Sequence, residues 1–150
     1  QFIVAVISVI LTLSTAMALG FRIEGSFATM LLIIFLLIIS VIGIGLIIVS
    51  FSKTSTFVLS MGTFPLFILM FFTGSIFPMP RNEIFEIGGH LFAWNDMLPP
   101  TYAVIALNKV MSLGGSFTVV QFELIMLTIL SILYFSVGVW LFKKLHFGKA

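Results

Sequence analysis

Residues whose type and spacing suggest chemistry are few in this chain, and they are widely separated. Ser50 and Lys53, in the stretch "SFSK", have the Ser-x-x-Lys spacing of enzymes that use the serine as a nucleophile. The companion motifs of those enzymes are missing, so we interpret the stretch as a solvated turn. His90 and His146 stand singly, and we read neither as a metal ligand. With no G-x-x-x-x-G-K-[ST] loop either, we expect no catalytic, cofactor or metal site and no enzymatic activity.

Two further features have both a functional and a structural reading. "IGIGL", with Gly43 and Gly45, contains part of a nucleotide-binding glycine pattern, but inside an apolar run close helix packing explains it better. Glu123 is the one charged residue inside a long apolar run, about one turn from its start. We favour an interfacial residue at that position over a proton relay. The lack of charge deeper in the runs fits a transport path powered elsewhere, and it fits an inert bundle as well.

The composition identifies the environment in which these residues must be positioned. Hydrophobic residues make up 61% of the 150-residue chain and charged residues 8%. Soluble domains average about 45–50% apolar and about 25% charged residues, so a membrane protein is indicated. The net charge of +2 is too small and too scattered for a nucleic-acid-binding face, so we expect no nucleic-acid partner. The chain has no cysteine, which excludes disulfides and thiolate metal sites.

Four apolar runs, delimited by charged residues, are long enough to cross a bilayer. A hydrocarbon core of about 30 Å needs about 20 apolar residues in a helix, because backbone groups in lipid must satisfy their own hydrogen bonds. We therefore predict an all-α integral membrane bundle of four transmembrane helices, near 1–21, 27–50, 55–77 and 117–142. Pro65 predicts a kink in the third. Residues 1–150 are expected to form a single transmembrane domain and to be a fragment of a longer chain.

The segment 82–113 departs from the apolar pattern without reading as a soluble loop. Large apolar side chains recur along it, interrupted at Gly88-Gly89 and at Pro99-Pro100. We predict an outer hairpin of two short helices near 82–113 that dips back into the membrane before the last span. The alternative is one amphipathic helix lying flat on the surface.

The basic residues predict the orientation, because they favour the cytoplasmic side. The turn after the second span and the C-terminal tail share one side, and on it are Lys53, Lys143, Lys144 and Lys149. The other side has Arg22, Arg81 and Lys109 over a much longer stretch. We therefore predict a multi-pass protein of a bacterial-type cell membrane with a cytoplasmic C-terminus.

Short motifs flank the outer segment, and a basic end closes the last span. The stretches are "FTGSIFPMP", "MLPPTYAVIALNKVMSLG" and "WLFKKLHF". In this order they resemble the C-terminal portion of type 2 ABC transporter permeases, in which a Ser/Thr-Gly-x-x-Phe-Pro motif, re-entrant outer helices, a Pro-x-Thr-Tyr-like motif and a final span follow one another. The residues that match the two motifs are Thr73, Gly74, Phe77 and Pro78 in the first, and Pro100, Thr101 and Tyr102 in the second. The stretch 25–55 also resembles the span and Ser-rich cytoplasmic turn that precede them in the family.

The resemblance implies a transmembrane permease subunit of an ATP-driven ABC exporter, which forms part of the translocation pathway. ATP and magnesium would then be bound by a separate P-loop ATPase subunit, and a second permease copy or homologue would complete the pathway in the bilayer. The seven motif residues would close an outer gate, and Ser52 and Lys53 would form part of a cytoplasmic coupling loop. A non-transporting membrane scaffold or assembly protein is the alternative, and the cargo stays open.

Overall fold

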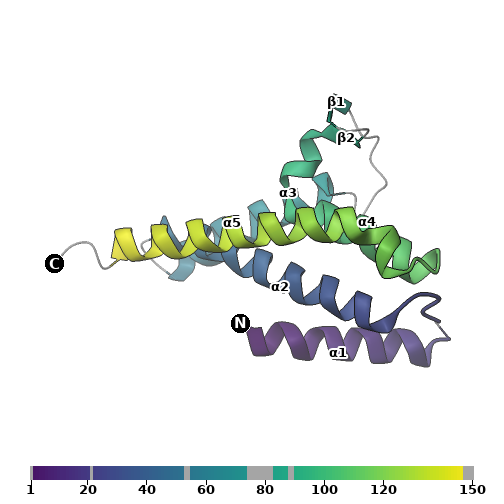
Figure 1. Ribbon diagram of the computed structural model, residues 1–150. Helices are drawn as coiled ribbons and strands as arrows, with labels where there is room; N and C mark the ends of the chain where they lie inside the picture. The colour runs from purple at the N-terminus through teal and green to yellow at the C-terminus, as the bar shows by residue number, and fades with distance from the viewer. Residues whose placement is uncertain (1, 21, 53–54, 74–82, 88–89, 147–150) are drawn as a thin grey trace.

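The computed structural model describes residues 2–20, 22–52, 55–73, 83–87 and 90–146, and these are mostly helical, as the sequence predicted (Figure 1). The α-helices are α1 (Phe2–Ala18), α2 (Phe27–Ser50), α3 (Ser55–Phe72), α4 (Pro99–Ser112) and α5 (Gln121–His146). The remaining elements are strands β1 (Glu83–Ile87) and β2 (His90–Ala93) and the short 3-10 helices η1 (Trp94–Met97) and η2 (Phe117–Val120).

Two helices within the described residues are long and apolar enough to cross a membrane. They are α2, with 24 residues, and the continuous helix Phe117–His146 formed by η2 and α5, with 30. The other two predicted spans are shorter, because α1 has 17 residues and α3 has 18. At 1.5 Å per residue they measure about 25 and 27 Å, slightly less than a typical bilayer core.

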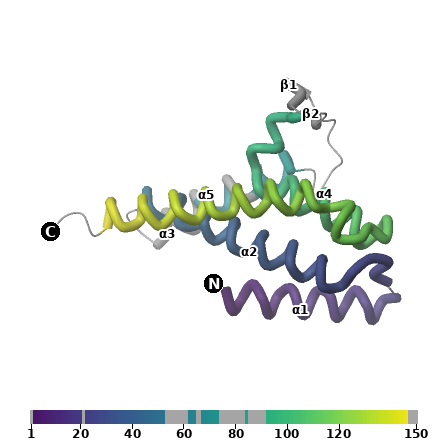
Figure 2. Tube along the Cα trace, viewed as in Figure 1, coloured from purple at the N-terminus to yellow at the C-terminus, as the bar shows by residue number. Residues whose placement is uncertain are grey.

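The long helices α2 and α5 lie side by side and run in the same direction (Figure 2). Small residues allow this close approach. A Cβ atom on Gly43 would lie 2.6 Å from the Phe135 backbone nitrogen, and one on Gly138 would lie 2.6 Å from the Gly43 carbonyl oxygen. The hydroxyl of Ser131 donates to the carbonyl oxygen of Leu36 at 3.0 Å, which joins the helices again two turns away. The prediction of close packing is therefore confirmed at Gly43, while Gly45 faces open space.

The packed core lies where α2, α4 and α5 meet. Its members are Met30 and Ile33 from α2, Tyr102, Ala103, Ala106 and Val110 from α4, and Val120, Leu124 and Leu127 from η2 and α5. Alanines on α4 bring its backbone close to its neighbours, which matters in lipid, where close packing rather than expulsion of water holds helices together.

Outside this core, α1 lies along the N-terminal half of α2 and runs in the opposite direction (Figure 1). The ring of Phe2 meets the ring of Phe35 edge to face at 6.1 Å. None of the α1 residues is buried, and large apolar side chains such as Ile3 are exposed. Its hydroxyls turn inward, because Thr12, Ser14 and Thr15 each donate to the carbonyl four residues earlier. A helix with this surface is suited to a hydrocarbon surrounding.

Helix α3 begins beside the C-terminal half of α2 and bends along its length (Figure 1). The helix continues through Pro65, the residue at which we predicted a kink. Its last residue is Phe72, whereas the sequence predicted a span to residue 77, and residues 74–77 lie outside the described part of the chain.

The first half of the predicted outer helical hairpin is wrong, because the chain forms an antiparallel pair of strands there. In the pair, Phe85 lies opposite Phe92, Glu86 opposite Leu91 and Ile87 opposite His90. "EIFEI" and "HLFA" are rich in aromatic and β-branched residues, which favour strands. They are separated by two glycines, a spacing typical of a β-hairpin and unfavourable for a continuous helix.

The second half of the prediction is confirmed as a helix, α4, which follows η1 and begins with two prolines. The start of α4 lies level with the middle of α5, because the Tyr134 hydroxyl of α5 donates to the Met97 carbonyl at 3.2 Å. Its end lies at the turn that precedes α2, where the Glu24 amide donates to the Met111 carbonyl. Gly114 then adopts a φ of 63°, a left-handed conformation that suits glycine and ends the helix.

Candidate functional site

Four of the predicted motif residues are described, and the structure distributes them over three environments. Thr73 follows the last residue of α3, and Pro100 stands in the first turn of α4; both line one pocket. Thr101 faces η1, and Tyr102 points into the core. Gly74, Phe77 and Pro78 lie outside the described residues. The two motifs therefore meet at Thr73 and Pro100.

A side-chain network joins the end of α3 to the start of α4. The Asn95 amide nitrogen donates to the Phe72 carbonyl oxygen at 2.6 Å, which satisfies a carbonyl that the end of α3 leaves without a helical partner. The Thr101 hydroxyl donates in turn to the Asn95 carbonyl oxygen. Asp96 caps η1, because its carboxylate accepts the Ala93 amide at 2.9 Å. These contacts fix the two motif segments relative to each other across 23 residues of sequence.

Tyr102 is a packing residue rather than part of the pocket. It is 2% exposed, and its ring meets the ring of Phe122 edge to face at 6.3 Å. Phe92 of β2 meets the same Phe122 ring at 6.3 Å. The aromatic cluster thus ties α4 and the strand pair to the first turn of α5.

The pocket itself is a partly open cavity of about 340 Å³ bordered by three helices. Its lining consists of Leu37, Val41 and Ile44 from α2, Leu69, Met70 and Thr73 from α3, and Pro100 and Val104 from α4. The hydroxyl of Thr73 donates to the Met70 carbonyl at 3.4 Å, so it is directed to the backbone of its own helix. No charged side chain belongs to this lining. The arrangement can hold an apolar group by shape, and it offers no polar chemistry of recognition.

An ion pair joins the far end of α4 to the beginning of α5. The Lys109 ammonium lies 2.6 Å from Glu123 Oε1, with 35% of the lysine side chain and 10% of the glutamate side chain exposed. Glu123 lies within the first turn of α5, close to the turn before α2. The partner of Glu123 was not recognised from the sequence, and the interfacial reading of this residue stays a prediction.

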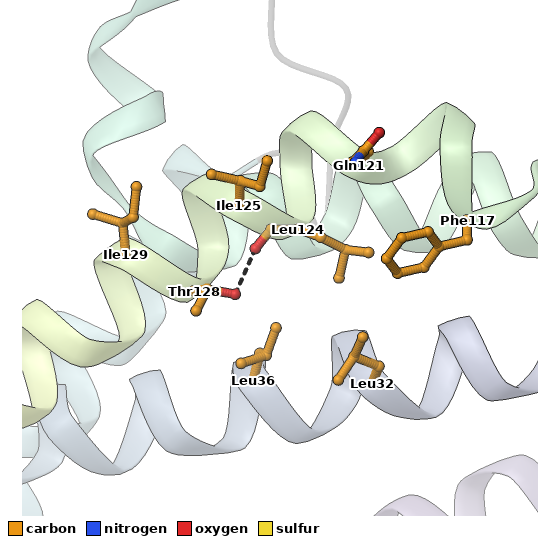
Figure 3. A pocket seen from close by; sticks show the side chains of 8 residues that line it. All are labelled: Leu32, Leu36, Phe117, Gln121, Leu124, Ile125, Thr128 and Ile129. Atoms are coloured by element: carbon orange, nitrogen blue, oxygen red, sulfur yellow. Dashed lines mark hydrogen bonds between the residues drawn. The ribbon is translucent and has the colours of Figure 1, made fainter.

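A second apolar pocket lies between α2 and the first half of α5, and Figure 3 shows it from close by. Its volume is about 480 Å³. Leu32 and Leu36 of α2 point toward Phe117 and Leu124, and the Thr128 hydroxyl donates to the Leu124 carbonyl at 2.7 Å. A third pocket of about 560 Å³ separates α1 from α2. The described linings of all three pockets are mainly apolar, and together we call them the apolar wall.

At the opposite end of α2, the predicted coupling loop is described only in part. The Ser52 hydroxyl donates to the Ile48 carbonyl at 3.1 Å, which extends the hydrogen bonding of α2 by one residue. Lys53 lies outside the described residues. Among the residues that are described, no group of three His, Cys, Asp or Glu side chains is arranged to hold a metal ion.

Comparisons of this chain with family models, with curated proteins and with solved structures find no match. The assignment of a role therefore rests on the geometry above. Asn95 and Lys109 are the functional candidates that motif reasoning missed. Both are polar residues in an otherwise apolar stretch, and that contrast was the available signal.

Proposed function

We propose that this chain is a transmembrane permease subunit of an ATP-driven ABC exporter and forms part of the translocation pathway. In this proposal α1, α2, α3 and α5 are the four membrane spans of a multi-pass protein. Helix α4 is a re-entrant helix that descends from the outer surface to the middle of the bilayer. ATP and magnesium are bound by a separate P-loop subunit, and a second copy or homologue completes the pathway.

The position of α4 along α2 is the observation that carries the proposal. Pro100 and Val104 face Leu37, Val41 and Ile44, which lie about 15 to 25 Å from the start of α2 at 1.5 Å per residue. The whole of α2 measures about 36 Å on the same scale. A helix that begins at mid-depth and ends at the outer turn is neither a span nor a flat surface helix. Non-spanning helices at that depth are tolerated where protein surrounds them or a cavity adjoins them, and α4 has both.

The direction of the helices gives further support. With α2 and α5 parallel, the turn before α2 and the turn before α5 lie at one end, and the end of α2 and the basic end of α5 lie at the other. The last turn of α5 carries Lys143, Lys144 and His146, with Lys144 4.8 Å above the Trp140 ring. Basic residues favour the cytoplasmic side and tryptophan favours a membrane interface, and both preferences support a cytoplasmic C-terminus.

The absence of charge from the apolar wall supports a separate source of energy. Ion-coupled transporters use charged side chains within the membrane, whereas the charged pair of the described helices, Lys109 and Glu123, lies near the outer turn. Transport along the wall then requires a conformational change driven by a partner. That requirement fits a permease whose ATPase is another subunit.

Co-purification tests this proposal. The full-length protein, tagged and extracted gently from its native membranes, is expected to bring down a stoichiometric soluble subunit with a P-loop and ATPase activity. A known permease–ATPase pair extracted in parallel serves as the control for subunit loss. Recovery of this chain alone, while the control pair stays intact, would contradict the permease role and favour a membrane scaffold.

A further inference from the structure

We propose that the pocket between α2, α3 and α4 binds a single hydrocarbon chain, such as the acyl chain of a lipid or of a lipid-like amphiphile. This binding site is a feature beyond the permease role. Only the identity of the bound hydrocarbon as cargo rests on that role. The residues that carry the inference are Leu37, Val41, Ile44, Leu69 and Val104, with Thr73 at the edge.

The chemistry of the lining selects hydrocarbon. Each of those five side chains is an aliphatic group, and the Thr73 hydroxyl donates to the Met70 carbonyl. A polar or charged ligand would lose its hydration there without gaining a partner. Water is unsuitable for the same reason, since a buried water needs two to four polar partners and apolar cavities stay dry or take up apolar ligands.

The size and position of the pocket select a chain rather than a bulky group. A cavity of about 340 Å³ is at the lower end of the range for small-molecule sites. Its α2 residues extend over about 10 Å of helix length, so the cavity is elongated along the helices. In a bilayer, acyl chains run in that same direction and form the surrounding solvent at that depth.

Polar neighbours at one end of the pocket add a place for the start of the chain. Thr73 and Pro100 close the cavity at the junction of α3 and α4, where Asn95 and Thr101 hold the backbone in place. The hydrocarbon would therefore contact the two segments whose separation defines the proposed outer gate. Occupancy of the pocket is expected to hold α3 away from α2 and so to favour a particular gate position.

Photolabelling tests the pocket without any need for ATPase activity. The full-length protein in vesicles receives a phospholipid that carries a diazirine at the end of one acyl chain, and the adducts are mapped by mass spectrometry. We expect saturable labelling concentrated on the α2, α3 and α4 residues of the pocket. Labelling that is non-saturable and spread evenly over the lipid-facing surface would overturn the inference.

A matched pair of variants sharpens the test. Val104→Phe fills the pocket, and Val137→Phe makes the same change at an exposed position on α5 outside the pockets described above. We expect Val104→Phe to reduce pocket labelling about tenfold, because the ring takes the volume that the chain would occupy. Val137→Phe should leave it unchanged. Equal labelling of the wild-type protein and a folded Val104→Phe variant would contradict the assignment.

Two competitors distinguish the source of the chain. If the occupant is a bilayer lipid, an unlabelled phospholipid reduces labelling of the pocket. If the site accepts a lone chain, a single-chain alkyl alcohol reduces the labelling and the unlabelled phospholipid does not. If the chain is cargo, adding ATP to the complex reduces the labelling, whereas a structural lipid stays. Labelling of the pocket in a protein that binds no ATPase would support the hydrocarbon site and contradict the permease role. The two proposals can therefore fail separately.

Discussion

The two sides of α2 are built in different ways. Toward α5, the helices touch through their backbones, with Gly43 and Gly138 facing each other and Ser131 donating across the gap. Toward α3, the contact leaves a cavity of about 340 Å³ that the first turns of α4 also border, and the Asn95 amide joins η1 to the end of α3 through the Phe72 carbonyl. One side is close-packed, and the other borders an open space.

This difference indicates which parts of the molecule can move. Close-packed backbone surfaces have one good arrangement, because any displacement forfeits many short contacts at once. A cavity bordered by side chains tolerates several arrangements. We therefore expect α2, α5 and α4, which share the packed core, to move as one unit and α3 to shift against them.

The largest expected effect is the loss of the close-packed side. Gly43→Leu places a side chain where a Cβ atom alone would already lie within 3 Å of the α5 backbone, so the helices must separate. We expect a loss of about 3 kcal/mol in stability, at the upper end of the range for overpacked sites. Thermal unfolding in detergent, followed through tryptophan fluorescence, measures it.

Gly45→Leu is the control for that change. It adds the same side chain to the same helix two residues away, where a Cβ atom meets nothing within 4 Å. We expect stability within about 0.5 kcal/mol of wild type, because the new side chain would extend into the pocket between α1 and α2 rather than into a packed contact. Equal losses at both glycines would show that α2 and α5 are not held by backbone contact.

The next effect concerns the ion pair that anchors the outer end of α4. Lys109→Met leaves the carboxylate of Glu123, whose side chain is 10% exposed, without its partner. We expect a loss of about 2 kcal/mol, less than for a fully buried pair because 35% of the lysine side chain is exposed. Glu123→Gln should cost less, since the lysine can reach water. Lys143→Met, at an exposed position on α5, is the control.

A double-mutant cycle completes this experiment. If the pair acts as a unit, the double variant Lys109→Met/Glu123→Gln should be more stable than the sum of the single losses predicts. Strict additivity of the two changes would mean that the contact contributes nothing to the anchoring of α4.

The smallest effect is expected at the polar link on the cavity side. Asn95→Ala removes the donor to the Phe72 carbonyl, and a single hydrogen bond of this kind contributes about 1 kcal/mol. Asn108→Ala, at an exposed position on α4, should be neutral or slightly stabilising because alanine is the better helix former. Hydrogen exchange at the end of α3 is the second measurement, and it should increase in the Asn95 variant only.

Much of the structure of α2 and α5 could be predicted, because the features that determine it are local in the sequence. Helix α2 is defined by the uncharged run between Glu24 and Lys53 and by Ser26, whose side chain accepts the Thr29 amide. The Gly43 packing site could be inferred from residue type. Its partner Gly138 could not, because which glycines face each other depends on the parallel direction and crossing point of two helices far apart in sequence.

The cavity side was predicted less well, for physical reasons that differ from one residue to the next. Phe85 and Phe92 were assigned to a helix because their apolar character was read as membrane helix, although the two-glycine spacing between the strands favours a hairpin. The site was inferred at Thr73 and Pro100 from a motif. The contact between Asn95 and Phe72 could not be inferred, because it depends on the tertiary placement of α3.

The most direct test of the account is the depth of α4 in the bilayer. The chain has no cysteine, so single cysteines can be introduced at Met97 and at Leu113, whose exposed fractions are similar at 64% and 74%. Spin labels at these positions in vesicles report depth through collision with oxygen and with a water-soluble nickel chelate. A re-entrant helix predicts that the Met97 label lies at mid-depth, about 15 Å or more below the Leu113 label, given 1.5 Å per residue along α4. Labels at equal depth in the interface would contradict the account, since α4 would then lie flat on the membrane surface.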